Sequence, residues 1–329
     1  MTAGVTADSS AITSAGGAPL HADDGTAPRV SDAMIDAWRR EGIALVPAAF
    51  SAAELAPVLA EYQRLHPLPD SPRAPAQHAD LGPRLGRFDK AQFENFLLFP
   101  FAADNAMNLL PLHPLLVDTA RRALGVNDVF MYQCHTWAKF TGETDYAQPF
   151  HMDFGNHTLL VPADEHRFGT INFIIYLTDV TRARGALAYV PRSVAHTVQA
   201  GDARFPRADV QTKLHAAEQL AEVPAGTLLL YDTATLHRGT NLTEPGGHRY
   251  SMTVSYRARD FETMGGNEWA RNGDSAPWAR LLPATTVEQA AAVGIPRPGH
   301  AYWTARTIAR TQARYPDWDL TPWRDALTG

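Results

Sequence analysis

Short apolar segments separated by turn-forming residues recur along the chain after residue 127. Each has the length of a strand, and several are rich in the β-branched and aromatic residues that favour extended structure. Such a series predicts an all-β barrel or sandwich core. The expected strands cover residues 127–140, 169–177, 186–190, 227–231 and 248–257.

The first part of the chain carries helical signals instead. A helix is expected from Ser31 or Asp32 to the residue before Gly42, followed by a short strand over 43–46. The sequence Ser51-Ala52-Ala53-Glu54 is a capping box that opens a second helix. A third helix follows His113-Pro114 and ends at Gly125, and the Pro-rich stretch 67–83 is expected to be a loop. The β core should therefore carry N-terminal helices.

Both ends of the chain differ from the middle. Residues 1–29 hold almost no large apolar side chains, so they cannot bury enough surface to fold and are predicted to be a disordered tail. Residues 30–329 are expected to form one domain around one core. Within it, the extension 258–329 is expected to pack on the barrel or to cover its mouth. This extension contains Trp269, Trp278, Trp303, Trp318 and Trp323.

Composition restricts the partners and the location. A net charge of -6 and a pI near 6.1 argue against nucleic acid or an anionic membrane as a partner, because either favours a basic patch. No apolar run has the length of a membrane span, and the start of the chain lacks the features of a signal peptide. The single Cys134 excludes an internal disulfide framework. We therefore expect a cytoplasmic monomer or homodimer that acts on a small molecule.

The segment His151-Met152-Asp153 and the distant His237 are candidate metal ligands. Side chains two apart on a strand point the same way, so His151 and Asp153 could face one ion. Two imidazoles and one carboxylate form the ligand set of a mononuclear iron site with open positions. The triplet alone is a weak signal in a chain with 13 histidines. His157 lacks the compact spacing and is expected to be a pocket or loop residue.

The expected strand 248–257 alternates strictly between polar and apolar side chains. A polar face of this kind is usually solvated. Alternatively, Arg249 and the hydroxyl of Ser251 could hold a carboxylate through charge-assisted contacts. The polar face would carry Arg249, Ser251, Thr253, Ser255 and Arg257, and the apolar face Tyr250, Met252, Val254 and Tyr256.

The expected strand 127–140 also has two unlike faces. If the face that includes His135 and Lys139 lines the interior, Lys139 could meet an anionic group. Otherwise that face is solvated. Asn172 and Tyr176 on the next strand carry the same two alternatives, and Phe154 beside the ligand pair completes the expected substrate pocket. The first face holds Gln133, His135, Trp137 and Lys139, and the second Tyr132, Cys134, Thr136 and Ala138.

Taken together, these residues resemble the phytanoyl-CoA dioxygenase-like branch of the iron(II)/2-oxoglutarate-dependent oxygenases, from about residue 30 to about 257. The resemblance includes the metal and Arg249-x-Ser251 motifs and the segment Lys139-Phe140-Thr141-Gly142. It also includes Gly185-Ala186-Leu187 and the stretch from Pro191 to His196, where Arg192 stands in place of the usual glycine.

The resemblance implies a mainly β fold with helical additions, a double-stranded β-helix or jelly-roll of the cupin type, with the metal at its open mouth. It implies Fe(II) on His151, Asp153 and His237, and O2 as a co-substrate. It further implies 2-oxoglutarate on Arg249 and Ser251, with His135 touching it. The retained Asp153 favours oxygen transfer, because halogenating relatives usually have Ala or Gly there.

The expected function is therefore hydroxylation, or another oxidation of an unactivated C–H bond, in a secondary metabolite or amino-acid-like molecule, with release of succinate and CO2. Two other classes remain open. A cupin-type isomerase or lyase would use a similar metal site but would not need Arg249-x-Ser251. A non-catalytic binding protein could keep the barrel, although the intact ligand set argues against it.

Overall fold

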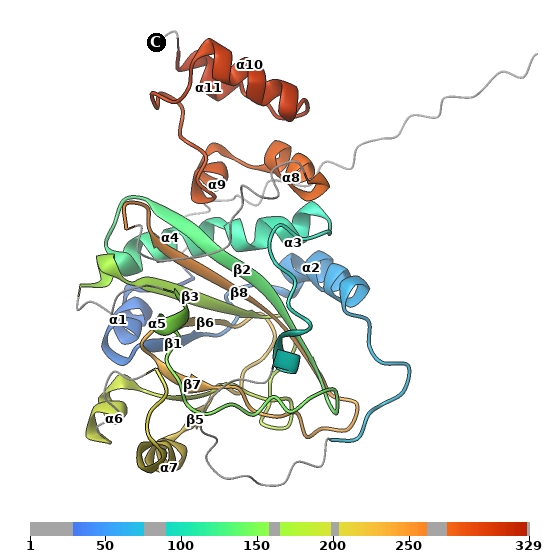
Figure 1. Ribbon diagram of the computed structural model, residues 1–329, viewed down its shortest axis with the longest axis vertical. Helices are drawn as coiled ribbons and strands as arrows, with labels where there is room; N and C mark the ends of the chain where they lie inside the picture. The colour runs from blue at the N-terminus through green and yellow to red at the C-terminus, as the bar shows by residue number, and fades with distance from the viewer. Residues whose placement is uncertain (1–28, 76–89, 158–164, 199–203, 262–274, 328–329) are drawn as a thin grey trace, which may run out of the picture.

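Two antiparallel sheets face each other in the computed structural model, which describes residues 29–75, 90–157, 165–198, 204–261 and 275–327 (Figure 1). The strand order is β1-β6-β3-β8-β2 in the five-stranded sheet and β5-β4-β7 in the three-stranded sheet. This architecture confirms the predicted jelly-roll with helical additions. The strands are β1 (Ile43–Val46), β2 (Val129–Phe140), β3 (Thr170–Tyr176), β4 (Ala188–Val190), β5 (Gln219–Leu220), β6 (Leu228–Tyr231), β7 (Leu236–Arg238) and β8 (His248–Ala258).

Helices cover the outer sides of both sheets. The predicted N-terminal helices are confirmed: Ser51 forms both contacts of its capping box, and the helices before Gly42 and Gly125 end at these glycines in the left-handed conformation. The helices are α1 (Asp32–Glu41), α2 (Ala52–Leu65), α3 (Asn105–Leu109), α4 (Pro114–Leu124), α5 (Phe154–His157), α6 (Arg192–Thr197), α7 (Ala208–Ala217), α8 (Ala276–Leu281), α9 (Val287–Ala292), α10 (Ala305–Arg314) and α11 (Thr321–Asp325).

The outer face of the five-stranded sheet forms the main hydrophobic core. Tyr250, Met252, Val254 and Tyr256 of β8 lie in this core, as predicted for the apolar face. Helix α4 packs on β3 and β8, and α9 packs on β2. The described part of the C-terminal extension therefore lies on this outer side, away from the three-stranded sheet (Figure 1). Its buried tryptophans are Trp278, Trp303, Trp318 and Trp323.

The inner face of β8 and β2 is polar but buried, whereas the inner face of β1, β3 and β6 also carries apolar side chains. The solvated interpretation of the β8 pattern was therefore wrong, because the three-stranded sheet covers this face. Arg249, Ser251, Thr253 and Ser255 are each at most 5% exposed. Alternating polar and apolar residues usually indicate that the polar face is exposed to solvent. Here the polar groups face an enclosed interior instead.

A bulge in β2 changes the predicted face of one residue. The register between β2 and β8 shifts between Met131 and Gln133, so Tyr132 is the extra residue. We expected Tyr132 on the face of Cys134, but its hydroxyl lies 2.6 Å from Nδ1 of His157 and 3.4 Å from Oδ1 of Asn172. A bulge breaks the two-residue period, and Tyr132 therefore joins Gln133 on the inner side.

Some predictions fall outside the described residues. These are the tail over 1–28, residues 76–83 of the predicted loop, and Trp269; residues 67–75 lack regular secondary structure, as expected. None of the described helices has the length and apolar composition that crossing a lipid bilayer demands.

That residues 30–329 form one domain stays a prediction, and Trp323 offers its test. This side chain is 2% exposed, and its indole donates to the carbonyl of Pro296. Replacing Trp323 by Ala should lower the free energy of unfolding by about 3 to 5 kcal/mol, because a large buried side chain is lost. Chemical denaturation should still show one transition. The control Tyr302→Ala removes a half-exposed ring and should cost less than about 1 kcal/mol.

A separate, early transition in the Trp323→Ala variant, with the remaining transition unchanged, would show instead that the extension unfolds as an independent unit.

Candidate metal centre

Main-chain pairing places two histidines side by side between the sheets. The N–H groups of His151 and His237 each donate to the carbonyl of the other residue, at 3.0 and 3.1 Å. Residues paired in this way project side chains on the same side, and the two imidazole centroids lie 4.4 Å apart. The expected continuous strand through Asp153 is not formed. His151 makes an isolated bridge, and Asp153 lies in the turn that leads into α5.

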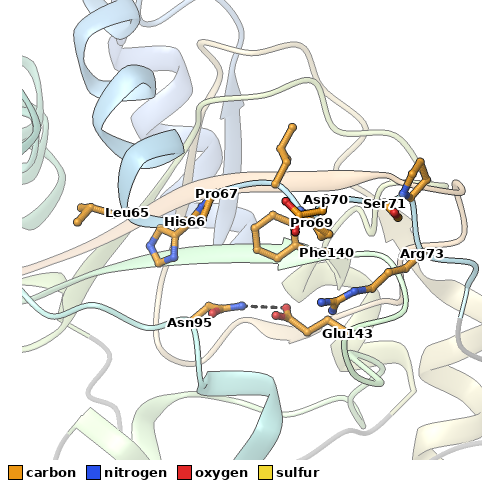
Figure 2. Close-up of a pocket in the computed structure, with 12 residues that line it drawn as sticks. Leu65, His66, Pro67, Pro69, Asp70, Ser71, Arg73, Asn95, Phe140 and Glu143 are labelled. Carbon is orange, nitrogen blue, oxygen red and sulfur yellow. Dashed lines mark hydrogen bonds between the residues drawn. The ribbon is translucent and has the colours of Figure 1, made fainter.

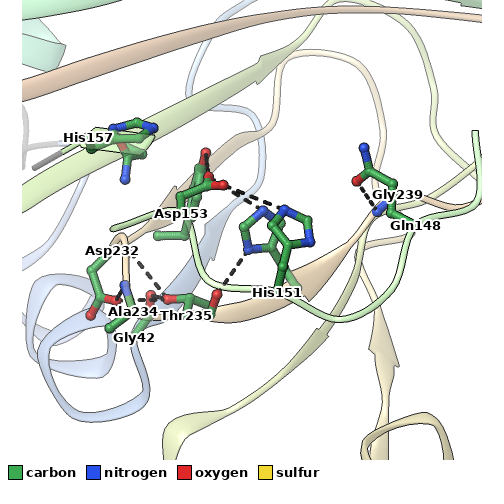
Figure 3. A network of polar contacts seen from close by, with 12 residues as sticks. Gly42, Gln148, His151, Asp153, His157, Asp232, Ala234, Thr235 and Gly239 are labelled. Carbon is green, nitrogen blue, oxygen red and sulfur yellow. Dashed lines mark hydrogen bonds and ion pairs between the residues drawn. The ribbon is translucent and has the colours of Figure 1, made fainter. Parts of the chain in front are cut away.

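The side chains of His151, Asp153 and His237 nevertheless converge. Figure 3 shows Asp153 directed toward His151. One ligand atom from each lies within 4.8 Å of the others. Nδ1 of His151 contacts the carbonyl of Pro149 at 3.0 Å, and Nδ1 of His237 contacts the carbonyl of Thr235 at 2.9 Å. A carbonyl only accepts, so each Nδ1 carries the proton and each Nε2 offers a lone pair. Both Nε2 atoms lie 3.5 Å from the Asp153 carboxylate.

The protonation states suit a cation. Burial lowers the pKa of His237 to about 4, although Asp153 opposes this shift, so the imidazole is neutral. Burial alone would raise the pKa of Asp153, but His237 and His151 outweigh it and hold that pKa below its usual range. Metal binding requires neutral imidazoles and an ionised carboxylate. The donor set therefore fits a divalent metal ion with open coordination positions.

Tyr231 orients the carboxylate from the end of β6. Its hydroxyl donates to Oδ2 of Asp153 at 3.2 Å. Burial, together with Asp153, raises the pKa of Tyr231 well above its usual value, so the phenol stays protonated. The sequence placed Tyr231 in a strand, but nothing in the local pattern indicated this contact.

Side-chain contacts fix the segment that connects β6 to His237. Figure 3 shows Asp232, Thr235 and Gly42 of this network. Asp232 forms an ion pair with Arg192, which also donates to the carbonyl of Arg39. The Thr235 hydroxyl donates to the carbonyl of Gly42 at 2.6 Å. A Cβ on Gly42 would lie 2.8 Å from that hydroxyl, and the residue has a φ of +77°, so glycine is required. Arg192, which stands where the similar family usually has glycine, therefore anchors the segment before His237.

Two buried cations lie on the inner face at one end of the sheet. Lys139 and Arg249 pair directly across β2 and β8 and are 0% and 4% exposed. Nζ of Lys139 lies 4.2 Å from the ring centre of Trp137 and 4.7 Å from that of Tyr146, and it has no hydrogen-bond partner among the described residues. Burial and then Arg249 lower the pKa of Lys139 well below its usual value.

Arg249 is also incompletely satisfied. It donates to the carbonyl of Gly185, but its Nε has no partner within the described chain. Ser251 and Tyr176 lie opposite each other on β8 and β3, next along from Arg249, and both are buried. Burial raises the pKa of Tyr176 to about 12, while Arg249 opposes this shift. No carboxylate in the described segments pairs with Arg249 or Lys139, so this end of the interior is prepared for an anion.

The remaining predicted pocket residues occupy the same interior. His135 is 5% exposed, stacks on Phe96 with ring centroids 4.3 Å apart, and lies on the same face as Lys139. Asn172 is fully buried on β3, and Gln133 is partly buried on β2. Phe154 is the exception, because it is partly buried at the start of α5 and packs against the cluster that contains Phe150 and Leu236. The structure thus brings the predicted site residues on β2, β3 and β8 to the interior, together with the three candidate metal ligands.

A cavity of about 650 Å³ lies elsewhere, beyond the end of α2 (Figure 2). It is lined by His66, Arg73 and Glu143 among others, and none of the predicted site residues contributes to it. Glu143 accepts hydrogen bonds from Asn95 and from Tyr146, whose ring lies beneath Lys139. The cavity therefore lies near the end of the sheet that holds Lys139 and Arg249, the cationic end.

A two-sheet barrel with two imidazoles and one carboxylate facing its interior is typical of mononuclear non-haem iron oxygenases. The chain belongs to the phytanoyl-CoA dioxygenase family, whose model matches residues 38–249. The match contains His151, Asp153, His237 and Arg249. The protein is accordingly an iron(II)/2-oxoglutarate-dependent oxygenase, as the resemblance implied.

Solved structures share the fold at low sequence identity. The carbocyclase SnoK from nogalamycin biosynthesis, described as non-haem and alpha-ketoglutarate dependent, is 20% identical, with 75% of this chain and 91% of that chain covered and a TM-score of 0.51. EctD from S. alaskensis with bound Fe is 18% identical, covers 75% and 86%, and has a TM-score of 0.51. The epimerase SnoN with Fe3+, alpha ketoglutarate and nogalamycin RO is 18% identical, covers 69% and 83%, and also scores 0.51.

Comparison with curated proteins yields no match.

The contact between Tyr231 and Asp153 predicts an effect on metal affinity. Replacing Tyr231 by Phe should weaken binding of Fe(II) or Co(II) about tenfold, because a ligand loses the group that orients it. Anaerobic titration calorimetry measures this. Tyr256→Phe is the matched control, since it removes a buried phenol contact with the carbonyl of Pro111 on the outer face and should leave metal affinity unchanged. Equal affinities in all three proteins would remove Tyr231 from the site.

His135 predicts a dependence of stability on pH. Burial, followed by repulsion from His157, lowers its pKa from 6.5 to about 4 in the folded protein. Between these values the unfolded chain binds a proton that the folded chain does not, so stability falls as pH falls through this window. The loss from this group approaches about 3 kcal/mol at the acid end. Urea denaturation should therefore show a shallower pH slope for His135→Gln, whereas parallel slopes would contradict this assignment.

Proposed function

We propose that the protein oxidises an unactivated C–H bond of a small organic molecule, by hydroxylation, desaturation or ring closure, while 2-oxoglutarate is converted to succinate and CO2. His151, Asp153 and His237 would hold Fe(II). When bound there, iron and 2-oxoglutarate together supply the activation of O2. The residues of the chain position these groups and exclude bulk water from them.

The pair of buried cations carries the proposal. A charge removed from water without a partner is costly, and Lys139 and Arg249 share one enclosed region with no carboxylate from the described chain. A dicarboxylate co-substrate would supply the missing negative charge. Its distal carboxylate would lie against Arg249, Lys139 and the Ser251 hydroxyl, while its other end reaches the metal. This extends the expected clamp, in which Lys139 was assigned to the substrate.

His135 supports the same arrangement. It lies between Gln133 and Lys139 along one face of β2, and its neutral imidazole can donate or accept a hydrogen bond without adding charge. We assign it a contact with 2-oxoglutarate. A cupin-type isomerase or lyase would not require 2-oxoglutarate, so dependence of turnover on this co-substrate separates the two functions.

The cationic end predicts a specific kinetic defect. Arg249→Ala should raise the KM for 2-oxoglutarate about 10- to 100-fold, because a charge-assisted contact of about 1.5 to 3 kcal/mol is lost. Lys139→Met, which keeps the volume of the stem, should raise it in the same direction. Uncoupled succinate formation gives the KM, and calorimetry should show unchanged Fe(II) affinity.

Asp153→Ala serves as the contrasting variant, since it should lose metal binding and turnover together. An Arg249→Ala enzyme whose 2-oxoglutarate dependence equals that of the wild type would refute the clamp.

A further inference from the structure

One row of side chains crosses the inner face of the five-stranded sheet beside the metal centre. In the ladder, Asn172 of β3 pairs with Tyr231 of β6 on one side and with Ser255 of β8 on the other. Ser255 in turn pairs with Gln133 of β2. Directly paired residues project on the same side of a sheet with Cβ atoms about 5 Å apart. Tyr231 donates to the candidate metal ligand Asp153. Asn172 therefore lies one strand away from a residue that contacts the metal centre.

Asn172 has an unused hydrogen-bonding group. The side chain is fully buried, and its Nδ2 has no partner among the described residues. Its Oδ1 lies 3.4 Å from the hydroxyl of Tyr132, which also contacts His157 at 2.6 Å. Turning the amide over would exchange the two atoms, but Tyr132 would still satisfy only one of them. The adjacent Ser255 is also fully buried.

The row carries no charge of its own. Gln133, Asn172 and Ser255 are neutral, and the cationic end lies six residues away along β2, which corresponds to about 20 Å of strand. Arg257, the next inner residue of β8, donates to the main-chain carbonyls of Ala258 and Arg259, and Arg204 lies against the ring of Phe205, at 5.0 Å. Both arginines keep their charge, so selectivity for a neutral group has to come from the amide of Asn172 itself.

We propose that this row is the recognition site for an uncharged hydrogen-bonding group of the substrate, a carboxamide or a hydroxyl. Asn172 supplies the central contact, and Gln133 and Ser255 flank it. The amide of Asn172 both donates and accepts, so it complements groups that do the same. The site rests on the proposed function, because its purpose is to hold a C–H bond of the substrate beside the metal while 2-oxoglutarate occupies the cationic end.

The test compares small probes that share a carbon skeleton and differ in the charge and polar atoms of the head group. Hexanamide, hexanoate and hexylamine form one set, and benzamide, benzoate and benzylamine a second. Each is added without O2 to the full-length protein loaded with Fe(II) and 2-oxoglutarate, and binding is followed by the change in the visible charge-transfer band. We expect each amide to bind at least about tenfold more tightly than its matching acid and amine.

Variants of Asn172 identify the group responsible. Asn172→Leu keeps the branching at Cγ but removes both polar atoms, so it should abolish the preference for amides, while the affinities for Fe(II) and 2-oxoglutarate stay unchanged. Asn172→Asp keeps the shape almost entirely and should shift the preference towards the amines, so the test survives if the Leu variant does not fold. Ile174→Leu, on the same face of β3, is the matched control and should retain the wild-type preference.

The two proposals fail in different ways. A wild-type protein that gives no charge-transfer band with Fe(II) and 2-oxoglutarate would overturn the proposed function. A normal band with no preference for amides, with a preference for the acids, or with a preference that persists in Asn172→Leu would overturn the recognition site alone.

Discussion

A charge or polar group buried without a partner is costly, and this constraint governs the interior of the protein. The inner face of the five-stranded sheet is lined with such groups, and the three-stranded sheet keeps them from water. Some find partners within the chain: Tyr231 donates to Asp153, and Tyr132 contacts His157. Lys139, Arg249 and Asn172 keep unsatisfied atoms in the described chain. Unsatisfied groups are best explained by the ligands that would complete them.

The outer face of the five-stranded sheet forms the main hydrophobic core, whereas the inner face carries the candidate site. The outer face buries apolar side chains against the N-terminal helices and the C-terminal extension, so the inner face is free to be polar. The metal ligands do not come from one regular element. His151 and His237 are fixed by their mutual main-chain hydrogen bonds, and the segment before His237 is held by Arg192 and Gly42. Backbone pairing and anchored loops therefore set the positions of the two histidines. This arrangement suits a site that must stay open to co-substrates.

Much of this could be predicted from the sequence, because strands, caps and the His-x-Asp pattern are local signals. The candidate ligands His151, Asp153 and His237, which converge in the structure, were named from this pattern, and the role of Arg249 from the family resemblance. What failed depended on distant parts of the chain. The pattern of β8 left both a solvated and a carboxylate-binding interpretation open, because it does not reveal the covering sheet. Tyr132 was assigned to the wrong face because a bulge leaves no mark in the alternation. Tyr231 was missed as a partner of Asp153, since that contact joins two segments far apart in sequence.

The most direct test of this account is a diffraction experiment on crystals grown with Fe(II) and 2-oxoglutarate in the absence of O2. Anomalous scattering locates the iron, and the electron density locates the co-substrate. The account predicts iron bonded to Nε2 of His151, Nε2 of His237 and the Asp153 carboxylate, with the distal carboxylate of 2-oxoglutarate between Arg249 and Lys139. Iron at another position, or a co-substrate whose distal carboxylate avoids both cations, would contradict it.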